Sequence, residues 1–236
     1  MTWLEDRAGC ITASRVHRLM SNRATTVIKF IAELIDERKH GPKPQFSTTA
    51  TEHGKIQESS ALKKYSEYTG KEAEDCFELF LEHPHIKFVG CSPDGLVFDN
   101  QLIENGVEVK CPVKLANHTK YFDPTINFYR PYFWQIQHSL LCTEASYWDF
   151  ISYFPGQKIW IERFERIELV QELLEERSCW ASNYIEYQAV PTEKHFADLE
   201  EVKLPKNLRG EAITADISFE SAKEVAGGTL LDYVGL

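Results

Sequence analysis

Apolar and polar residues follow one another along this chain with two different periods. In residues 25–41 and 51–69, apolar side chains recur every three to four positions, and a glycine ends or follows each stretch. This spacing is typical of amphipathic helices, and glycine is a common helix stop. The sequence therefore predicts helices over both stretches. Thr12 and Ser14 are candidate caps for a further helix near the N-terminus.

Beyond residue 75 the sequence pattern changes to that of β-strands. Residues 76–83, 86–99 and 106–113 are rich in aromatic and β-branched side chains, and turn-forming residues interrupt them. These turn-forming residues lie at 83–84, 93–95 and 105–106. Short segments of this kind, bounded by turns, predict three consecutive strands of an antiparallel meander.

The remaining pattern predicts a mixed fold. A buried helix is expected over 129–143, strands over 146–155 and 158–167, and an amphipathic helix over 168–188. Helices, meander, helix, strands and helix in this order indicate an α/β fold with a central mixed β-sheet flanked by helices.

Residues 191–236 are less patterned, with a linker-like stretch followed by a short predicted helix and a tail. We expect a single domain over 1–190 and a C-terminal extension over 191–236. The ending "TLLDYVGL" is too apolar for a free end, so we expect the extension to pack on the domain or on a neighbouring subunit.

Composition narrows the classes of protein. The net charge of −10 argues against a protein that coats nucleic acid nonspecifically, although residues 110–130 are locally basic. The six cysteines are scattered without a CxxC pair, which argues against a zinc ribbon. No apolar run reaches membrane-helix length, and the N-terminus lacks the apolar core of a signal peptide. These features predict a cytosolic protein with no membrane partner.

Candidate chemistry gathers in residues 90–114. Glu108 and Lys110 alternate with Val107 and Val109, so a strand would place the acid and the lysine on the same face. Asp94 stands in a Pro–Asp–Gly turn where the preceding strand begins. Two converging carboxylates suit Mg²⁺, and a nearby lysine can stabilise charge on a phosphate. Each feature alone has an ordinary explanation, as a solvated strand face or a simple turn, but together they favour phosphodiester hydrolysis.

Several motifs sharpen this interpretation. Asp94, thirteen intervening residues and then "EVK" resemble the PD-(D/E)xK nuclease superfamily, with its restriction-endonuclease-like core. The motifs "GCITAS", "EHGKIQE", "CSPDGL", "VEVKCP" and "WQIQHSL", in this order, resemble the phage lambda-type exonuclease or viral recombinase family. The resemblance covers roughly residues 3 to 190.

The resemblance implies a metal site and a catalytic lysine. Asp94, Glu108 and the helix residue Glu58 match the acidic metal ligands, and Val109 matches a ligand that binds through its backbone carbonyl. Lys110 matches the catalytic lysine. The implied cofactor is a pair of Mg²⁺ ions, with Mn²⁺ as a substitute. On the residues alone, Glu58 is an ordinary acid on an exposed-looking helix face.

The resemblance also implies groups around the metal site. Gln135 matches a glutamine that positions the attacking water or the lysine, while Arg7 and Ser14 match a pocket for a 5′-phosphate. The family tends to place an arginine after "VEVKCP", and this chain has none. Lys114 or His118 is the available substitute, although a lysine lacks the bidentate fork of arginine.

The implied activity is 5′→3′ degradation of one strand of linear double-stranded DNA, exposing a 3′ strand for recombination in a phage-infected or prophage-carrying bacterial host. The family further implies a homotrimer that encircles DNA and a single-strand annealing protein as partner. Two alternatives stay open at this point. One is an endonuclease of the same superfamily, of the restriction or repair type, and the other is a noncatalytic DNA-end-binding module.

Overall fold

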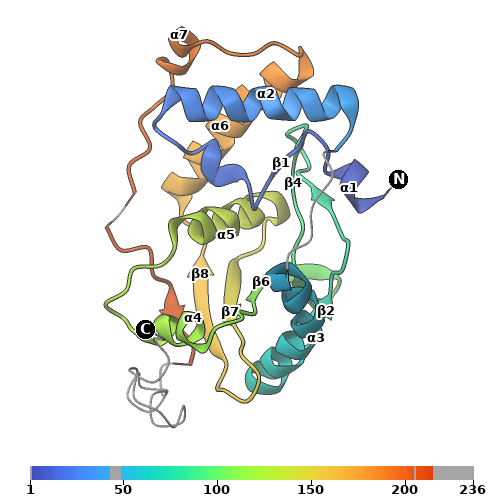
Figure 1. Ribbon diagram of the computed structural model, residues 1–236, viewed down its shortest axis with the longest axis vertical. Helices are drawn as coiled ribbons and strands as arrows, with labels where there is room; N and C mark the ends of the chain where they lie inside the picture. Colours follow the sequence, from blue (N-terminus) through green and yellow to red (C-terminus); the bar gives the residue numbers. More distant parts are fainter. Residues whose placement is uncertain (1, 43–48, 205, 215–236) are drawn as a thin grey trace.

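A six-stranded mixed sheet forms the centre of the molecule (Figure 1). The computed structural model describes residues 2–42, 49–204 and 206–214. The strand order is β2-β5-β6-β7-β8-β9; β6 and β7 are parallel and the other neighbours are antiparallel. The strands of this sheet are β2 (Glu74–Asp75), β5 (Gly95–Asp99), β6 (Leu102–Lys110), β7 (Tyr147–Ser152), β8 (Trp160–Glu165) and β9 (Glu211–Ala212).

A second, small sheet lies beside the first, with the order β1-β4-β3. Its strands are β1 (Ile11–Thr12), β3 (Leu81–Glu82) and β4 (Val89–Cys91). The two sheets and their helices confirm the predicted mixed α/β fold, and the α/β pattern continues through the second half of the chain as expected.

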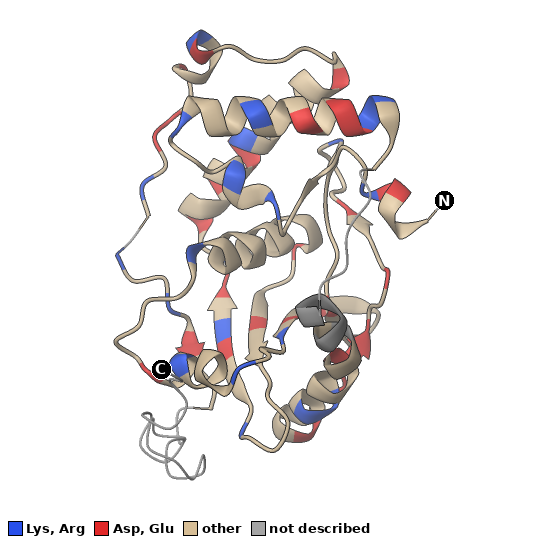
Figure 2. Cartoon of the chain, viewed as in Figure 1, with Lys and Arg blue, Asp and Glu red and all other residues tan. Residues whose placement is uncertain are grey.

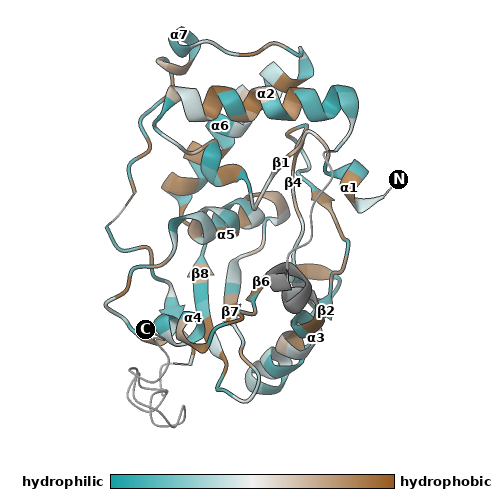
Figure 3. Cartoon of the chain, in the orientation of Figure 1, coloured by the Kyte–Doolittle hydropathy of each residue, from teal (hydrophilic) through white to brown (hydrophobic). Residues whose placement is uncertain are grey.

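Helices cover both faces of the central sheet. The described helices are α1 (Trp3–Asp6), η1 (Val16–Arg18), α2 (Ala24–His40), α3 (Thr49–Thr69), α4 (Leu115–Thr119), η2 (Lys120–Phe122), α5 (Arg130–Thr143), α6 (Glu168–Glu186) and α7 (Glu193–Phe196). Helix α5 packs on one face, with α6 and α2 beyond it, and α3 packs on the other face. Apolar and polar residues alternate around α2 and α6 (Figure 3), as expected for helices that cover a core on one side.

Strand β6 divides its side chains between the two faces as the sequence predicts. Val107 and Val109 join a buried cluster with Leu62 and Tyr65 of α3. Glu108 faces α5 instead and is 2% exposed. The strict alternation of a β-strand therefore sends the valines into the core and the carboxylate to the opposite face.

Three details of the predicted meander are wrong. Of the strand expected over 76–83, only Leu81–Glu82 (β3) forms a strand. The expected strand over 86–99 is two strands in two sheets, β4 and β5, and it breaks at Pro93, which has no N–H to donate to a ladder. The expected turn at 105–106 lies inside β6. The β5–β6 hairpin turns at Asn100 and Gln101 instead, and both take positive φ angles, of 47° and 71°.

The N-terminal segment also differs from expectation. Neither Thr12 nor Ser14 caps a helix: Thr12 belongs to β1, and only the short 3-10 turn η1 follows. Pairing of β1 with β4 holds residue 12 in an extended conformation, because Ile11 and Thr12 lie opposite Val89 and Gly90.

The described part of residues 191–214 runs along the domain. Arg177 donates to the carbonyl of Glu200, and Asn22 and Val202 exchange two hydrogen bonds. β9 then adds to the edge of β8. The domain boundary at residue 190 stays a prediction, and the short helix expected near the C-terminus lies outside the described residues. In the described part of the chain, we find no helix long and apolar enough to cross a membrane.

Candidate active site

Asp94 stands between β4 and β5, next to strand β6. Gly95 pairs with Val107 in antiparallel register, which brings the preceding Asp94 alongside Glu108. The backbone N–H of Val109 donates to Asp94 Oδ2 at 2.7 Å. The proline break and this hydrogen bond together fix the Asp94 carboxylate at the start of the hairpin.

Glu108 is the centre of a polar cluster on the α5 face. Its Oε1 accepts hydrogen bonds from Lys110 Nζ and from Gln135 Nε2, the latter at 2.7 Å. The ring of Tyr132, on the same face of α5 as Gln135, lies 5.1 Å from Lys110 Nζ. The alternation of β6 and the helical spacing of α5 thus bring an acid, a base and an amide together.

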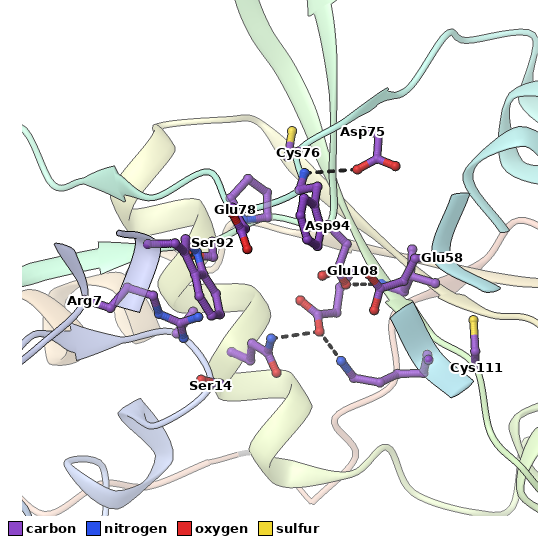
Figure 4. Close-up of a pocket in the computed structure, with 18 residues that line it drawn as sticks. Arg7, Ser14, Glu58, Asp75, Cys76, Glu78, Ser92, Asp94, Glu108 and Cys111 are labelled. Atoms are coloured by element: carbon purple, nitrogen blue, oxygen red, sulfur yellow. Dashed lines mark hydrogen bonds and ion pairs between the residues drawn. The ribbon is translucent and has the colours of Figure 1, made fainter. Parts of the chain in front are cut away.

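These groups open into a pocket of about 450 Å³ (Figure 4). It is lined by side chains from α1, the β1–η1 turn, α3, β2, the β4–β5 break, β6 and α5. All but one of the site residues predicted from the sequence line this pocket: Arg7, Ser14, Glu58, Asp94, Glu108, Val109, Lys110 and Gln135.

Lys114 is the predicted site residue that does not line the pocket. It is exposed at the N-terminus of α4. His118, the other candidate for the missing arginine, is buried, and its ring nitrogens bond to Ser152 Oγ and the carbonyl of Lys158. The structure therefore places neither substitute beside the carboxylates, and a phosphate-binding role for Lys114 stays a prediction without geometric support.

The electrostatics of the carboxylates reflect burial and crowding. Burial, with the nearby Asp94 and Glu58 charges, raises the pKa of Glu108 to about 7, although Lys110 acts in the opposite direction. Burial likewise raises the pKa of Asp94. Burial alone would lower the pKa of Lys110, but the Glu108 and Asp94 carboxylates outweigh it and raise that pKa. The cluster therefore concentrates negative charge around one ammonium group.

Arg7 and Ser14 approach the pocket from the N-terminal segment. The Arg7 guanidinium lies 4.0 Å from the centroid of the Trp3 ring, and the Trp3 indole N–H donates to Ser92 Oγ at 3.1 Å. Burial and the neighbouring Arg15 lower the pKa of Arg7. Among the described residues, no carboxylate pairs with Arg7, which leaves its guanidinium available to an anion.

Helix α5 is hydrogen-bonded to both β1 and β4. His138 of α5, fully buried, places Nε2 at 3.1 Å from the carbonyl oxygen of Ile11 and 3.3 Å from that of Gly90. It thereby ties β1 and β4 to the helix that carries Gln135. The phosphate-pocket candidates and the carboxylates, distant in sequence, are brought together by this contact and by the β1–β4 pairing.

The residues present fit divalent cations such as Mg²⁺. Within the described ranges, no three His, Cys, Asp or Glu side chains already converge as a closed metal centre. Glu58, Asp94 and Glu108 instead line one pocket, and the pKa values of Asp94 and Glu108 show carboxyl groups that are destabilised when charged. Carboxylate oxygens are the ligands that Mg²⁺ prefers, and a bound cation would relieve this cost.

Sequence reasoning missed the other lining residues, among them Trp3, Asp75 and Phe77. Trp3 supports Arg7 four positions later at the end of α1, and this i, i+4 spacing of an aromatic and an arginine was the available signal. Asp75 and Phe77 lie around the two-residue strand β2, which has too short a pattern to recognise.

Solved structures resemble this fold. The alkaline exonuclease LHK-Exo from Laribacter hongkongensis is 29% identical, with 79% of this chain and 92% of that chain covered and a TM-score of 0.65; its complex with dAMP gives 0.66. A phage-related exonuclease from Haemophilus somnus 129PT, 12% identical, shares the fold, with 76% and 94% covered and a TM-score of 0.58.

The sequence matches a known family as well. Residues 2–146 match the model of the YqaJ-like viral recombinase domain, a span that includes every residue of the pocket. No curated protein matches the chain. The resemblance to the viral recombinase family and the restriction-endonuclease-like α/β fold are confirmed. With its fold, its motifs and more than half of its length in agreement, this chain is a member of the YqaJ-like viral recombinase family.

Proposed function

We propose that this protein is a Mg²⁺-dependent 5′→3′ exonuclease that degrades one strand of linear double-stranded DNA. The exposed 3′ strand would then serve recombination by annealing. The observation that carries the proposal is the composition of this pocket. A carboxylate–lysine cluster lies at one end, and an arginine without a carboxylate partner among the described residues lies in the same pocket.

The carboxylate end supports hydrolysis of a phosphodiester. Two Mg²⁺ ions, or Mn²⁺ in their place, held by Glu58, Asp94, Glu108 and the Val109 carbonyl, would supply an activated water and stabilise charge on the leaving oxygen. Asp94 is oriented for this role by the Val109 N–H, at 2.7 Å. Backbone contacts of this kind keep a ligand carboxylate in one orientation.

Lys110 and Gln135 have supporting roles, in charge stabilisation and in the orientation of Glu108. The Lys110 ammonium, held against Glu108, stabilises negative charge that develops on the scissile phosphate. The Gln135 amide holds the same Glu108 oxygen from α5 and so limits how the carboxylate can rotate. Both side chains donate a hydrogen bond to the same oxygen of Glu108, Oε1.

The part of the pocket around Arg7 supports recognition of the 5′ end of a DNA strand. A guanidinium forms strong paired hydrogen bonds to phosphate, and the nearby Ser14 hydroxyl can donate one more. A 5′-phosphate held there would place the next phosphodiester at the carboxylates, which gives 5′→3′ polarity and a requirement for an end. The complex of LHK-Exo with dAMP shows a nucleotide bound to a relative.

The proposal extends to assembly and partner. A homotrimer around the duplex would keep the enzyme on its substrate, and a single-strand annealing protein would receive the exposed strand. The net charge of −10 and the interspersed acidic and basic residues (Figure 2) are compatible with binding of DNA confined to the pocket and its surroundings.

Degradation of matched DNA substrates tests the proposal. Linear duplexes with 5′-phosphate or 5′-hydroxyl ends and a closed circle are incubated with Mg²⁺ or with chelator. We expect Mg²⁺-dependent loss of the linear DNA from its 5′ ends, faster with the phosphate, and an intact circle. Cleavage of the circle would replace the proposal with an endonuclease. End binding without cleavage would replace it with a binding module.

A substitution tests the assignment of the pocket. Lys110→Ala should abolish degradation while leaving duplex binding in chelator measurable, and exposed Lys194→Ala on α7 is the matched control. Unchanged cleavage by Lys110→Ala would contradict the catalytic role of this cluster.

A further inference from the structure

The aromatic ring of Tyr132 lies beside the ammonium group of Lys110. Lys110 Nζ stands over this ring at 5.1 Å from its centroid, within the range of a cation–π contact. Tyr132 precedes Gln135 by one helical turn of α5, and the Gln135 amide bonds to Glu108. The hydrolytic mechanism proposed above gives the ring no role, although it contacts the residue to which we assign charge stabilisation.

Aromatic neighbours fix the orientation of the Tyr132 ring. Phe150 of β7 stacks against it, with centroids 5.8 Å apart and planes inclined by 29°. Tyr129 packs edge-on at 4.9 Å, and Phe128 packs edge-on at 6.5 Å. Phe150 lies opposite Glu108 in the parallel β6–β7 register, so the stack joins the ring to the strand beside the carboxylate. These three contacts hold the side chain itself and not only its backbone.

Lys110 needs a partner other than Glu108 once a cation is bound. In the structure its ammonium donates to Glu108 Oε1. A cation at that carboxylate competes for the same oxygen and repels the ammonium, because both are positive. Lysine carries its charge on a flexible stem, and 28% of this side chain is exposed, so the ammonium can turn away into solvent. The electron-rich face of an aromatic ring also attracts an ammonium group, and it is not a ligand that Mg²⁺ prefers.

We propose that Tyr132 is a positioning residue that keeps the Lys110 ammonium at the scissile phosphate when a cation occupies Glu108. This inference rests on the proposed nuclease function. Tyr132 acts through Lys110 and not on the DNA, since it does not line the pocket. The aromatic face is therefore needed and the Tyr132 hydroxyl is not. Loss of the ring should lower kcat and leave the KM for DNA ends unchanged.

Lys71 provides a comparison within the same molecule. Its Nζ lies 5.3 Å from the centroid of the Tyr147 ring, and it bonds to the Tyr147 hydroxyl at 2.6 Å and to Glu104. None of these three residues lines the pocket. A lysine thus lies over a tyrosine ring both at the pocket and away from it, and only Lys110 should respond to a change at Tyr132.

The NMR signals of lysine side chains test the contact without DNA. In protein labelled with isotopes at lysine only, the Tyr132 ring should shift the ε-methylene signal of Lys110 upfield of those of exposed lysines. Lys110→Gln identifies this signal. We expect the shift to persist in saturating Mg²⁺ and to disappear in Tyr132→Leu, while the Lys71 signal is unchanged in both cases. A wild-type Lys110 signal that moves to the position of exposed lysines in Mg²⁺ would overturn the proposal.

Steady-state kinetics on a 5′-phosphorylated linear duplex with Mg²⁺ test the effect on the reaction. For Tyr132→Leu, which keeps an apolar side chain without a ring, we expect kcat to fall about tenfold at unchanged KM, the value of one cation–π contact. Tyr132→Phe should retain the wild-type kcat. Tyr184→Leu is the matched control, at a half-buried tyrosine of α6 that packs on Trp180 outside the pocket. Circular dichroism checks that each variant is folded.

The outcomes separate this proposal from the nuclease itself. An unchanged kcat in Tyr132→Leu, or a Tyr132→Phe variant as slow as Tyr132→Leu, would refute the role of the ring while degradation of linear DNA by the wild type stands. If the wild-type protein degrades no DNA in Mg²⁺, the nuclease proposal fails, whatever the Lys110 signal shows. If Tyr132→Leu does not fold, the wild-type Lys110 signal in Mg²⁺ and the kcat of Tyr132→Phe decide.

Discussion

Two buried carboxylates on opposite faces of the same sheet have very different surroundings. Asp149 of β7 lies on the α3 face, where both its oxygens accept from Arg163 at 2.8 Å and one also accepts from the Tyr65 hydroxyl at 2.8 Å. Glu108 of β6 lies on the α5 face, and Lys110 and Gln135 both bond to a single oxygen. Asp149 is enclosed, whereas Glu108 lines a pocket.

The difference separates a structural carboxylate from one that we propose to be catalytic. A buried charge is tolerated when its hydrogen-bonding capacity is filled, and Asp149 meets that condition with a bidentate arginine. Glu108 keeps one oxygen without a hydrogen bond from any described residue, and its pKa is raised to about 7 by burial. The protein gives up stability at Glu108 and retains a group that can bind a cation.

The largest effect is expected at Glu108. Glu108→Gln keeps the shape but removes the charge, so we expect cleavage to fall about 10³-fold, since a metal ligand contributes several kcal/mol to the transition state. The net effect on stability should be small, because the amide removes the cost of burying the Glu108 charge but also removes the charged partner of Lys110. The pKa of Glu108 is higher in the folded protein, about 7, than in the unfolded chain, so the folded state loses stability as pH rises between these two values. Glutamine does not ionise, so the variant lacks this pH-dependent loss of stability. Nuclease rates and urea unfolding at pH 8 measure both quantities.

Asp149→Asn should have the opposite effect, a large loss of stability with little change in cleavage. The amide leaves the partly buried Arg163 guanidinium without its charged partner, and breaking a buried ion pair in this way costs about 3–5 kcal/mol of unfolding free energy. Cleavage by the folded fraction should change little. Urea unfolding monitored by circular dichroism measures the loss, and a midpoint equal to that of the wild type would contradict the structural role.

Two buried histidines predict an acid-labile core. Burial lowers the pKa values of His118 and His138 to about 4 from an ordinary value of 6.5. Between these pH values the unfolded chain binds more protons than the folded one, so stability is present above about pH 6.5 and is lost as pH falls towards 4. The loss is up to about 3 kcal/mol for each histidine. Unfolding measured at pH 7.5 and pH 5 tests this, with His138→Gln as the variant that should depend less on pH.

The smallest effect is expected at the other end of the pocket. Arg7→Gln should reduce the preference for a 5′-phosphate over a 5′-hydroxyl about tenfold, the value of one charge-assisted hydrogen bond. Exposed Arg23→Gln, outside the pocket, is the control. An unchanged preference in Arg7→Gln would remove Arg7 from the phosphate site.

The long elements of the fold were predictable, and the short ones were not. Helices α2, α3, α5 and α6 repeat their apolar positions over several turns, so their local pattern is sufficient. β2 and β3 have two residues each, and only pairing with distant strands defines them. The turn at Asn100 and Gln101 contains no glycine, whereas Asn105–Gly106 resembles a turn but lies in a strand where Gly106 makes room for the ring of Trp148.

The site residues also fall into those that the local sequence pattern predicted and those that it did not. Asp94, Glu108 and Lys110 lie within one hairpin, so strand alternation and spacing were enough to bring them together. Arg7, Ser14 and Glu58 reach the pocket from other segments, and only the family resemblance indicated them. Asp75 and Phe77 gave no signal, because the two-residue strand β2 that brings them to the pocket has too short a pattern to recognise.

The most direct test compares Glu108→Gln with Asp149→Asn on one substrate. Degradation of a 5′-phosphorylated linear duplex with Mg²⁺ is measured for both variants, and each rate is divided by the fraction of folded protein. We predict that the Asp149 variant retains cleavage within a few-fold of wild type, whereas the Glu108 variant loses about 10³-fold. Equal rates for the two variants, or cleavage retained by Glu108→Gln, would contradict the assignment of the α5 face as the catalytic face.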